Sequence, residues 1–294
     1  MLCSEKRGYA WNMQLFLDHA GVVGGPESSL SEQWRRLGFS VTNPHELLGS
    51  AEQGHAALGQ TSCHAVLGQG YIELSRVYSL DPAHHLSSYL RRGAGLHILA
   101  LGTQDIDAAR REFANAGVPC SAIAWASRNI SYGERHGMAR FQWFMVSPDA
   151  APEGLLCVVR NHTAELVYQP QVMTHPNSAV ALRGMVIACH DVSKAALRYQ
   201  GLLGVAPQSL GEDQCLILQG GQILLREISV CAELHGTDAQ AAQDRYAALL
   251  VAVRDMSQTR AWLQSQHVPF TTHGDALQLS AAQGGGAALV FVPQ

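Results

Sequence analysis

The sequence lacks the features that would assign the chain to a membrane or to nucleic acid. No apolar run approaches the ~20 residues that a membrane-spanning helix needs. No cluster of Lys and Arg forms a basic face, and the net charge is −4 with a pI near 6.4. We therefore expect neither a membrane protein nor a nucleic-acid-binding protein.

The sequence also lacks the short motifs of several enzyme classes. It has no P-loop, no G-x-G-x-x-G after a strand and no G-x-S-x-G, which argues against nucleotide binding and serine-hydrolase chemistry. Its seven cysteines show no paired spacing, so we expect reduced thiols rather than a disulfide framework or a zinc ribbon. Together with an N-terminus that has no apolar signal-peptide core, this favours a cytoplasmic location.

One small unit recurs along the chain. It consists of a strand-like apolar run, an Asp, an amphipathic helix of about four turns and a Gly-Val-type stop. Three clear copies of the Asp-to-Val segment lie at 105–118, 191–205 and 255–268, and a looser first copy lies at 17–39. Each copy is too small to bury its own core, so we expect the copies to pair.

Each copy is expected to fold as a strand, a helix and two or three further strands, which gives an α+β protein built of four βαβββ modules. The expected helices lie at 28–37, 105–116, 193–203 and 256–266. We expect a loose extension at 1–12, an N-terminal domain of two modules at 13–164, a connector at 165–177 and a C-terminal domain of two modules at 178–294.

This arrangement resembles the vicinal oxygen chelate superfamily, which includes glyoxalases, bleomycin-resistance proteins and extradiol ring-cleaving dioxygenases. Five segments narrow the resemblance to the glyoxalase-like branch: 17–19 (LDH), 55–64, 70–74 (GYIEL), 161–170 and 175–177 (HPN). The resemblance implies that the modules pair into two cup-shaped mixed sheets with the helices outside. It also implies metal ligands on the first and last strands of each module.

The N-terminal modules carry ligand-type side chains at these positions. His19 and His97 lie on the expected first strands, and Glu73 and Cys157 lie three residues after a glycine on the last strands. Two imidazoles and a carboxylate suit one divalent ion, Fe, Mn, Ni or Zn, and a thiolate would favour Zn. The C-terminal modules have no such residues, so we expect the chemistry in the N-terminal cup and a scaffold or interface role for the other.

Further residues are candidates for catalysis and substrate binding. Candidates for a general base or a substitute ligand are Glu165, His162 and His64. Candidates for substrate contact are Tyr71, Arg140 and Trp143. His84 and His85 lie in a polar loop and are interpreted as surface histidines.

Three functions remain open. The first is a metal-dependent glyoxalase-like isomerase or lyase that binds a small substrate through two neighbouring oxygens. The second is an Fe(II) ring-cleaving dioxygenase, and the third is a non-catalytic protein that binds a small molecule. The partner is expected to be a small molecule, with the chain itself a monomer or homodimer.

Overall fold

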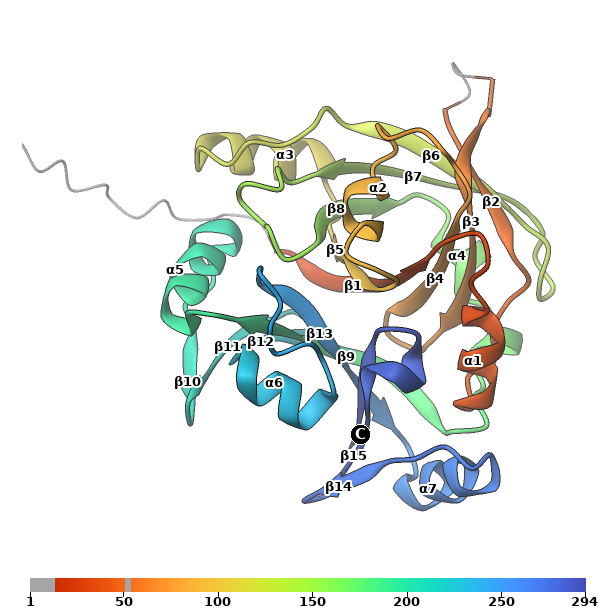
Figure 1. The fold of residues 1–294 in the computed structure, drawn as a ribbon. Helices are drawn as coiled ribbons and strands as arrows, with labels where there is room; N and C mark the ends of the chain where they lie inside the picture. The colour runs from red at the N-terminus through yellow and green to blue at the C-terminus, as the bar shows by residue number, and fades with distance from the viewer. Residues whose placement is uncertain (1–13, 51–53) are drawn as a thin grey trace, which may run out of the picture.

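The computed structural model of the chain describes residues 14–50 and 54–294 (Figure 1). The extension expected at 1–12 therefore lies outside the described residues. The described chain forms two eight-stranded sheets, the first closed into a barrel and the second open. No helix in the described part is both long and apolar enough to cross a membrane. The expected α+β fold of paired βαβββ modules is confirmed.

The N-terminal half is the barrel, with strand order β1-β4-β3-β2-β6-β7-β8-β5. Its first module contains β1 (Phe16–Gly24), α1 (Leu30–Arg36), β2 (His45–Leu48), β3 (Ala57–Val66) and β4 (Tyr71–Val77). After α2 (Ser87–Leu90), its second module contains β5 (Gly95–Gly102), α3 (Ile106–Asn115), β6 (Ala124–Ile130), β7 (Gly137–Met145) and β8 (Leu155–Asn161). The first strands of the two modules, β1 and β5, pair antiparallel, and each pairs in parallel with the last strand of its own module.

The C-terminal half is the open sheet, with strand order β10-β11-β12-β9-β13-β16-β15-β14. It follows α4 (Ala164–Val167) and the 3-10 turn η2 (Pro170–Val172). Its elements are β9 (Ala179–Cys189), α5 (Val192–Leu203), β10 (Gln208–Leu210), β11 (Asp213–Leu218), β12 (Gly221–Glu227), α6 (Ile228–His235), β13 (Arg245–Val253), α7 (Met256–Ser265), β14 (Thr271–His273), β15 (Ala276–Leu279), the 3-10 turn η3 (Ala281–Gly284) and β16 (Ala288–Pro293).

The Asp that opens each clear copy of the repeat is a helix N-cap. The side chains of Asp105, Asp191 and Asp255 each accept a hydrogen bond from a backbone N–H in the first turn of the following helix. In the first copy, Ser29 precedes α1 and makes no such side-chain bond. The looser sequence of the first copy thus corresponds to a short helix without a side-chain cap.

Among the described residues, the strands β2, β6, β10 and β14 and the helices α2, α4 and α6 differ from the expectation. Strands β2 and β6 were not expected, because β2 is only four residues long and β6 interrupts its apolar pattern with Ser127, Arg128 and Asn129. Helix α6 was also not expected. It begins where an apolar strand was predicted to end, and the Glu227 side chain accepts a hydrogen bond from its first turn.

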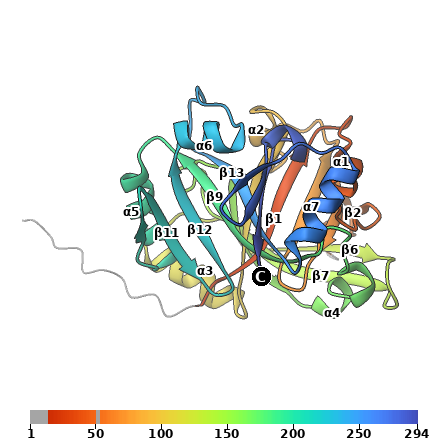
Figure 2. The same ribbon diagram turned by 90° about the horizontal axis from the view of Figure 1, so that it is seen from below.

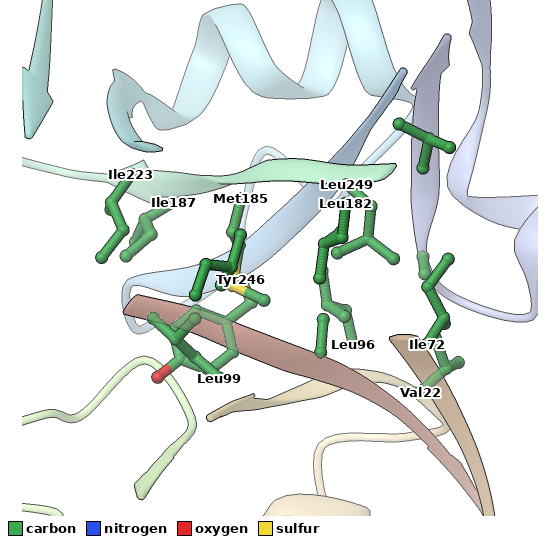
Figure 3. Close-up of a cluster of buried hydrophobic side chains, with 14 of the residues drawn as sticks. Val22, Ile72, Leu96, Leu99, Leu182, Met185, Ile187, Ile223, Tyr246 and Leu249 are labelled. Atoms are coloured by element: carbon green, nitrogen blue, oxygen red, sulfur yellow. The ribbon is translucent and has the colours of Figure 1, made fainter. Parts of the chain in front are cut away.

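A large apolar core joins the two halves. Figure 3 shows side chains of the barrel and of the C-terminal sheet meeting in one cluster: Val22, Ile72, Leu96 and Leu99 from the barrel, and Leu182, Met185, Ile187, Ile223, Tyr246 and Leu249 from the sheet. The open sheet therefore packs against the outside of the barrel, where it covers β1 and β5 (Figure 2).

The other face of the C-terminal sheet is covered by α6 (Figure 1). Ile228 and Cys231 of this helix pack into a cluster with Val186, Leu224 and Leu250 of the sheet. Apolar side chains and a helix thus fill the place that corresponds to the inside of the barrel. Of the two sheets in the described chain, the barrel is the one with a polar interior, and this interior is the candidate site.

Candidate functional site

The inside of the barrel contains a small cavity of about 60 Å³ with one polar and one apolar wall. The polar wall is formed by His19, Gln60, Tyr71, Glu73, His85 and Arg128. The apolar wall is formed by Leu47, Ile98, Phe141, Trp143, Leu155, Cys157 and Val159. Most of the polar wall comes from the first module, and most of the apolar wall comes from the second.

His19 and Glu73 point toward each other across neighbouring strands. Nε2 of His19 lies 3.6 Å from Oε2 of Glu73, and both residues are buried. Nδ1 of His19 donates to Oδ1 of Asp18 at 2.7 Å, which leaves Nε2 facing the carboxylate. The His19 ring also stacks on Tyr71, with a centroid separation of 4.4 Å. The hydrogen bond to Asp18 and the stacking on Tyr71 therefore fix the orientation of the His19 imidazole.

The Glu73 carboxylate is held by two serine hydroxyls. Ser62 and Ser75 donate to its Oε1 at 2.9 and 2.5 Å, so that Oε2 is the oxygen left toward His19. Burial on its own raises the pKa of Glu73, but His19, Arg128 and the two hydroxyls outweigh it and bring the pKa below the ordinary value. Glu73 is thus a buried carboxylate that stays ionised.

Arg128 of β6 places a cation in the same interior. It is 4% exposed, and its guanidinium lies over the rings of Tyr71 and Phe141 at 5.6 and 5.5 Å. Nη1 donates to Nε2 of His64 at 2.6 Å. Burial, with Arg128 next, holds the pKa of His64 well below its ordinary value, so this imidazole is neutral. Tyr71 and Glu73 raise the pKa of Arg128 despite its burial, which keeps the guanidinium charged.

Several buried polar atoms around these residues have no hydrogen-bond partner within the protein. They are Nε2 of His45, Oε1 of Gln60, Nδ1 of His64 and Nε of Arg128. Native proteins satisfy nearly all buried polar atoms, so each exception requires an explanation. Four such atoms within one barrel indicate an interior built to hold a small polar ligand or ordered water.

The structure does not bring His97 to this cavity. Glu73 pairs with Gly21 and Cys157 pairs with Ala100, so the residue of β5 that corresponds to His19 is Ile98. The pairing of β1 with β5 shows the same relation, because His19 faces Ala100 and Gly21 faces Ile98. A bulge next to Ile98 turns His97 away, and its Nε2 lies 2.8 Å from the Gly93 carbonyl. The expected position of His97 is thus corrected by one residue.

Cys157 does line the cavity, but its thiol is a poor metal ligand. Burial, together with the nearby Glu73 and Asp18 charges, raises the pKa of its thiol far above the ordinary value. The His19 imidazole and the Glu73 carboxylate are the donors that face each other, and the His85 imidazole also lines the cavity, beside a neutral thiol and a guanidinium. No group of three or more His, Cys, Asp or Glu side chains in the described chain is arranged to hold a metal ion. This donor set does not fit the divalent ion expected from the sequence.

The remaining candidates divide between the inside and the outside of the barrel. Tyr71 and Trp143 line the cavity, and His64 is buried next to Arg128. Arg140 is exposed on the outer face of β7. His162 is exposed, stacks on Trp125 and pairs with Gln142, while Glu165 is exposed at the start of α4. These last three were expected at the site, and strand alternation and the direction of α4 carry them away from it.

Three residues of the polar wall were not expected from the sequence. Arg128 shares one face of β6 with the buried Ala126 and Ile130, but this strand was not expected. His85 was interpreted as a surface histidine, yet it lines the cavity, and burial lowers its pKa to about 4. Gln60 is fully buried on β3 and gave no signal beyond its place near the loop motif.

Comparison with known proteins agrees with this architecture. Residues 17–203 match the family described as the glyoxalase-like domain. No curated protein matches the sequence. A hypothetical protein from Staphylococcus aureus has a similar fold, with a TM-score of 0.61 at 12% identity over 96% of this chain and 100% of its own.

Two enzymes have similar folds. A mutant of 4-hydroxymandelate synthase from Streptomyces coelicolor gives a TM-score of 0.62 at 14% identity, over 95% of this chain and 92% of its own. A fusion of a xylose isomerase-like TIM barrel with 4-hydroxyphenylpyruvate dioxygenase gives 0.56 at 15% identity, over 94% of this chain and 48% of its own. At these identities the likeness extends to the fold alone.

Proposed function

This chain belongs to the glyoxalase-like domain family of the vicinal oxygen chelate superfamily, and we propose that its N-terminal barrel is the active site of an isomerase or lyase. The proposed substrate is a small molecule with two neighbouring oxygens, such as an α-hydroxy aldehyde or ketone. The observation that carries the proposal is the convergence of Glu73, His19 and Arg128 on one cavity. Buried polar atoms without protein partners surround it.

In this proposal Arg128 is the cation that holds the substrate oxygens. Its guanidinium remains charged in an interior where few solvent molecules screen it, and its Nε is still without a partner. A preorganised positive group in such a site stabilises an oxyanion far more than it would in water. No three donor side chains of the described residues are arranged to hold the divalent ion expected from the sequence, so the proposal contains no step through a metal.

Glu73 and His19 are the groups that move the proton. Oε2 of Glu73 takes the proton from the carbon next to the carbonyl, and the electron pair passes to the carbonyl oxygen to give an enediolate beside Arg128. Return of this proton to the former carbonyl carbon, together with passage of the substrate's hydroxyl proton to the former carbonyl oxygen, completes an isomerisation. His19, fixed by Asp18, lies 3.6 Å from Oε2 and shares the transferred proton. Because a carboxylate of lowered pKa is a weak base, stabilisation of the enediolate must provide much of the rate.

Proton exchange provides a direct test. We would incubate the full chain in D₂O with glycolaldehyde, lactaldehyde and dihydroxyacetone and follow deuterium incorporation at the α-carbon by NMR. We expect exchange with the wild type, a loss of about 10²–10⁴-fold in Glu73→Gln, and no change in Arg140→Gln, whose side chain lies outside the barrel. Exchange that is equally fast in Glu73→Gln would contradict the proposal.

The same protein and compounds distinguish the proposed isomerase or lyase from the other two candidate functions. Saturable binding of these compounds without exchange would instead favour the non-catalytic binding protein. Oxygen consumption with a catechol after anaerobic Fe(II) loading would favour the dioxygenase, a function that requires a facial triad of three protein donors around one metal ion.

A further inference from the structure

A second cavity lies where the barrel meets the C-terminal half. Its volume is about 170 Å³, and none of its lining residues also lines the cavity inside the barrel. The barrel contributes the start of β5 and the turn before β8. The C-terminal half contributes the segment after α6, the start of β13 and the turn after η3. Any ligand held here would therefore contact both halves of the molecule.

Positive charge prevails in this second cavity. Arg92 and Arg245 line it, and neither forms an ion pair with any described residue. Of its two acidic residues, Glu153 is already paired with Arg198 and accepts from the Tyr199 hydroxyl at 3.2 Å. Only Asp238 then opposes two guanidinium groups, which leaves an excess of positive charge.

The hydrogen-bonding groups of the cavity are mainly donors without acceptors. Nε of Arg245 and Oγ1 of Thr237 are buried and have no partner. Arg92 uses Nη1 for the carbonyls of Pro152 and Glu153, at 2.9 and 3.3 Å, and its other nitrogens have no protein acceptor within the described chain. Unsatisfied buried donors beside excess positive charge call for a ligand that brings several acceptor oxygens and negative charge.

His97 lines the same cavity and is neutral. Its Nε2 donates to the Gly93 carbonyl at 2.8 Å, and this bond leaves Nδ1 as an acceptor. Burial, with smaller contributions from Arg92 and Arg245, lowers the pKa of His97. A ligand that carries a hydroxyl or an acidic proton next to its anionic group would match this acceptor.

From these features we propose that the junction cavity is a binding site for a small oxyanion, a carboxylate or a phosphate monoester, held by Arg92, Arg245 and Thr237. Arg245 provides the buried donor, Arg92 covers the solvent side, and Thr237 adds a hydroxyl. The volume accommodates a single small anion rather than a nucleotide. This site is independent of the chemistry proposed for the barrel, because it uses none of the same residues.

The test measures anion binding by the full chain. We would titrate inorganic phosphate and, separately, acetate, using isothermal calorimetry and the midpoint of thermal unfolding, with sodium chloride at matched ionic strength as the reference. We expect saturable binding of at least one of the two anions and a higher unfolding midpoint, because the ligand binds only the folded junction. Which anion saturates distinguishes a phosphate site from a carboxylate site.

Variants assign the binding to this cavity. We expect Arg245→Gln and Arg92→Gln each to weaken binding at least about tenfold, and Thr237→Ala to weaken it less, while Arg140→Gln and Glu73→Gln bind as the wild type does. Circular dichroism would establish that each variant is folded, and Arg92→Gln, at an exposed position, is the variant least able to disturb folding. No saturation by either anion beyond the chloride effect, or binding unchanged in both arginine variants, would overturn the proposal.

Discussion

Arg128 and His64 are joined by a hydrogen bond inside the barrel, in which Nη1 of the arginine donates to Nε2 of the histidine at 2.6 Å. The bond requires a neutral His64 with its proton on Nδ1, and burial provides this neutral state by lowering its pKa. His64 therefore orients the guanidinium without competing with it for negative charge. Glu73, on the neighbouring strand, remains the ionised counterpart within the same interior.

Replacement of Arg128 should remove the cation from the site. We expect Arg128→Gln to lower the rate of α-proton exchange by about 10²–10³-fold, as for other lost oxyanion-stabilising groups. Arg128→Lys should recover only part of this loss, because an ammonium group does not reproduce the planar fork that contacts His64. The measurement is the exchange rate against substrate concentration, with Arg140→Gln as the control for a lost surface charge. A normal rate in Arg128→Gln would remove Arg128 from the mechanism.

The lowered pKa of Glu73 links stability to pH. A carboxyl whose pKa is lower in the folded than in the unfolded chain stabilises the fold above its unfolded pKa, and this contribution is lost as the pH falls through the folded value. The unfolding free energies of wild type and Glu73→Gln should therefore differ near neutral pH and converge as the pH falls below 4.5. Urea denaturation at several pH values measures this. A gap that widens in acid would mean that the Glu73 pKa is raised instead.

Structural features that depend on local sequence could be predicted before the structure was known. The capping Asp residues and the helices that follow them result from contacts close in sequence, and the structure confirms these helices. The pairing of modules joins distant segments, and it was expected because the unit recurs; the structure confirms it too. Glu73 and Tyr71 were expected to share one face of an apolar strand, opposite Ile72 and Leu74, and both line the cavity. Strand alternation is a local property, so a single sequence is enough to reveal it.

Side-chain positions that depend on strand register could not be predicted from the sequence. His97 and Ile98 are neighbours, and only the bulge between β1 and β5 decides which of them faces inward. The place of Arg128 was also not predictable from local sequence, because its strand is identified by pairing with β7 and β2 rather than by its own composition. The sequence therefore predicted a metal site, where the structure has an isoleucine and a guanidinium.

A substitution at Ile98 should create the missing donor. Ile98 lies in the position that corresponds to His19 and covers Gly21, which has no side chain of its own. Ile98→His would add a second imidazole to His19 and Glu73. We expect Zn(II) binding more than about tenfold tighter than in the wild type, since even outer partners of metal ligands are worth about 10–100-fold. Competition with a chromophoric chelator measures the affinity.

Two matched variants control this gain. His97→Gln should leave metal content and affinity at the wild-type level, because His97 lies outside the cavity. Combining Ile98→His with Glu73→Gln should abolish the gain, because one of the three donors is lost. Stoichiometric metal in wild-type protein purified without added metal, lost in Glu73→Gln, would show instead that the present donors suffice and that Arg128 does not replace a metal ion.

The His175-Pro176-Asn177 motif fastens the chain to the first module and does not line the cavity inside the barrel. Nδ2 of Asn177 donates to the Leu37 carbonyl and its Oδ1 accepts from the Ala179 N–H, both at 3.0 Å, and the residue is fully buried. Asn177→Ala leaves two buried backbone groups without partners, at about 1–3 kcal/mol each, so we expect the unfolding free energy to fall by about 2–6 kcal/mol. Asn43→Ala, at an exposed position, should change it by less than about 0.5 kcal/mol. The exchange rate per folded molecule should stay at the wild-type value in both variants. A slower rate in folded Asn177→Ala would place the motif in the catalytic machinery after all.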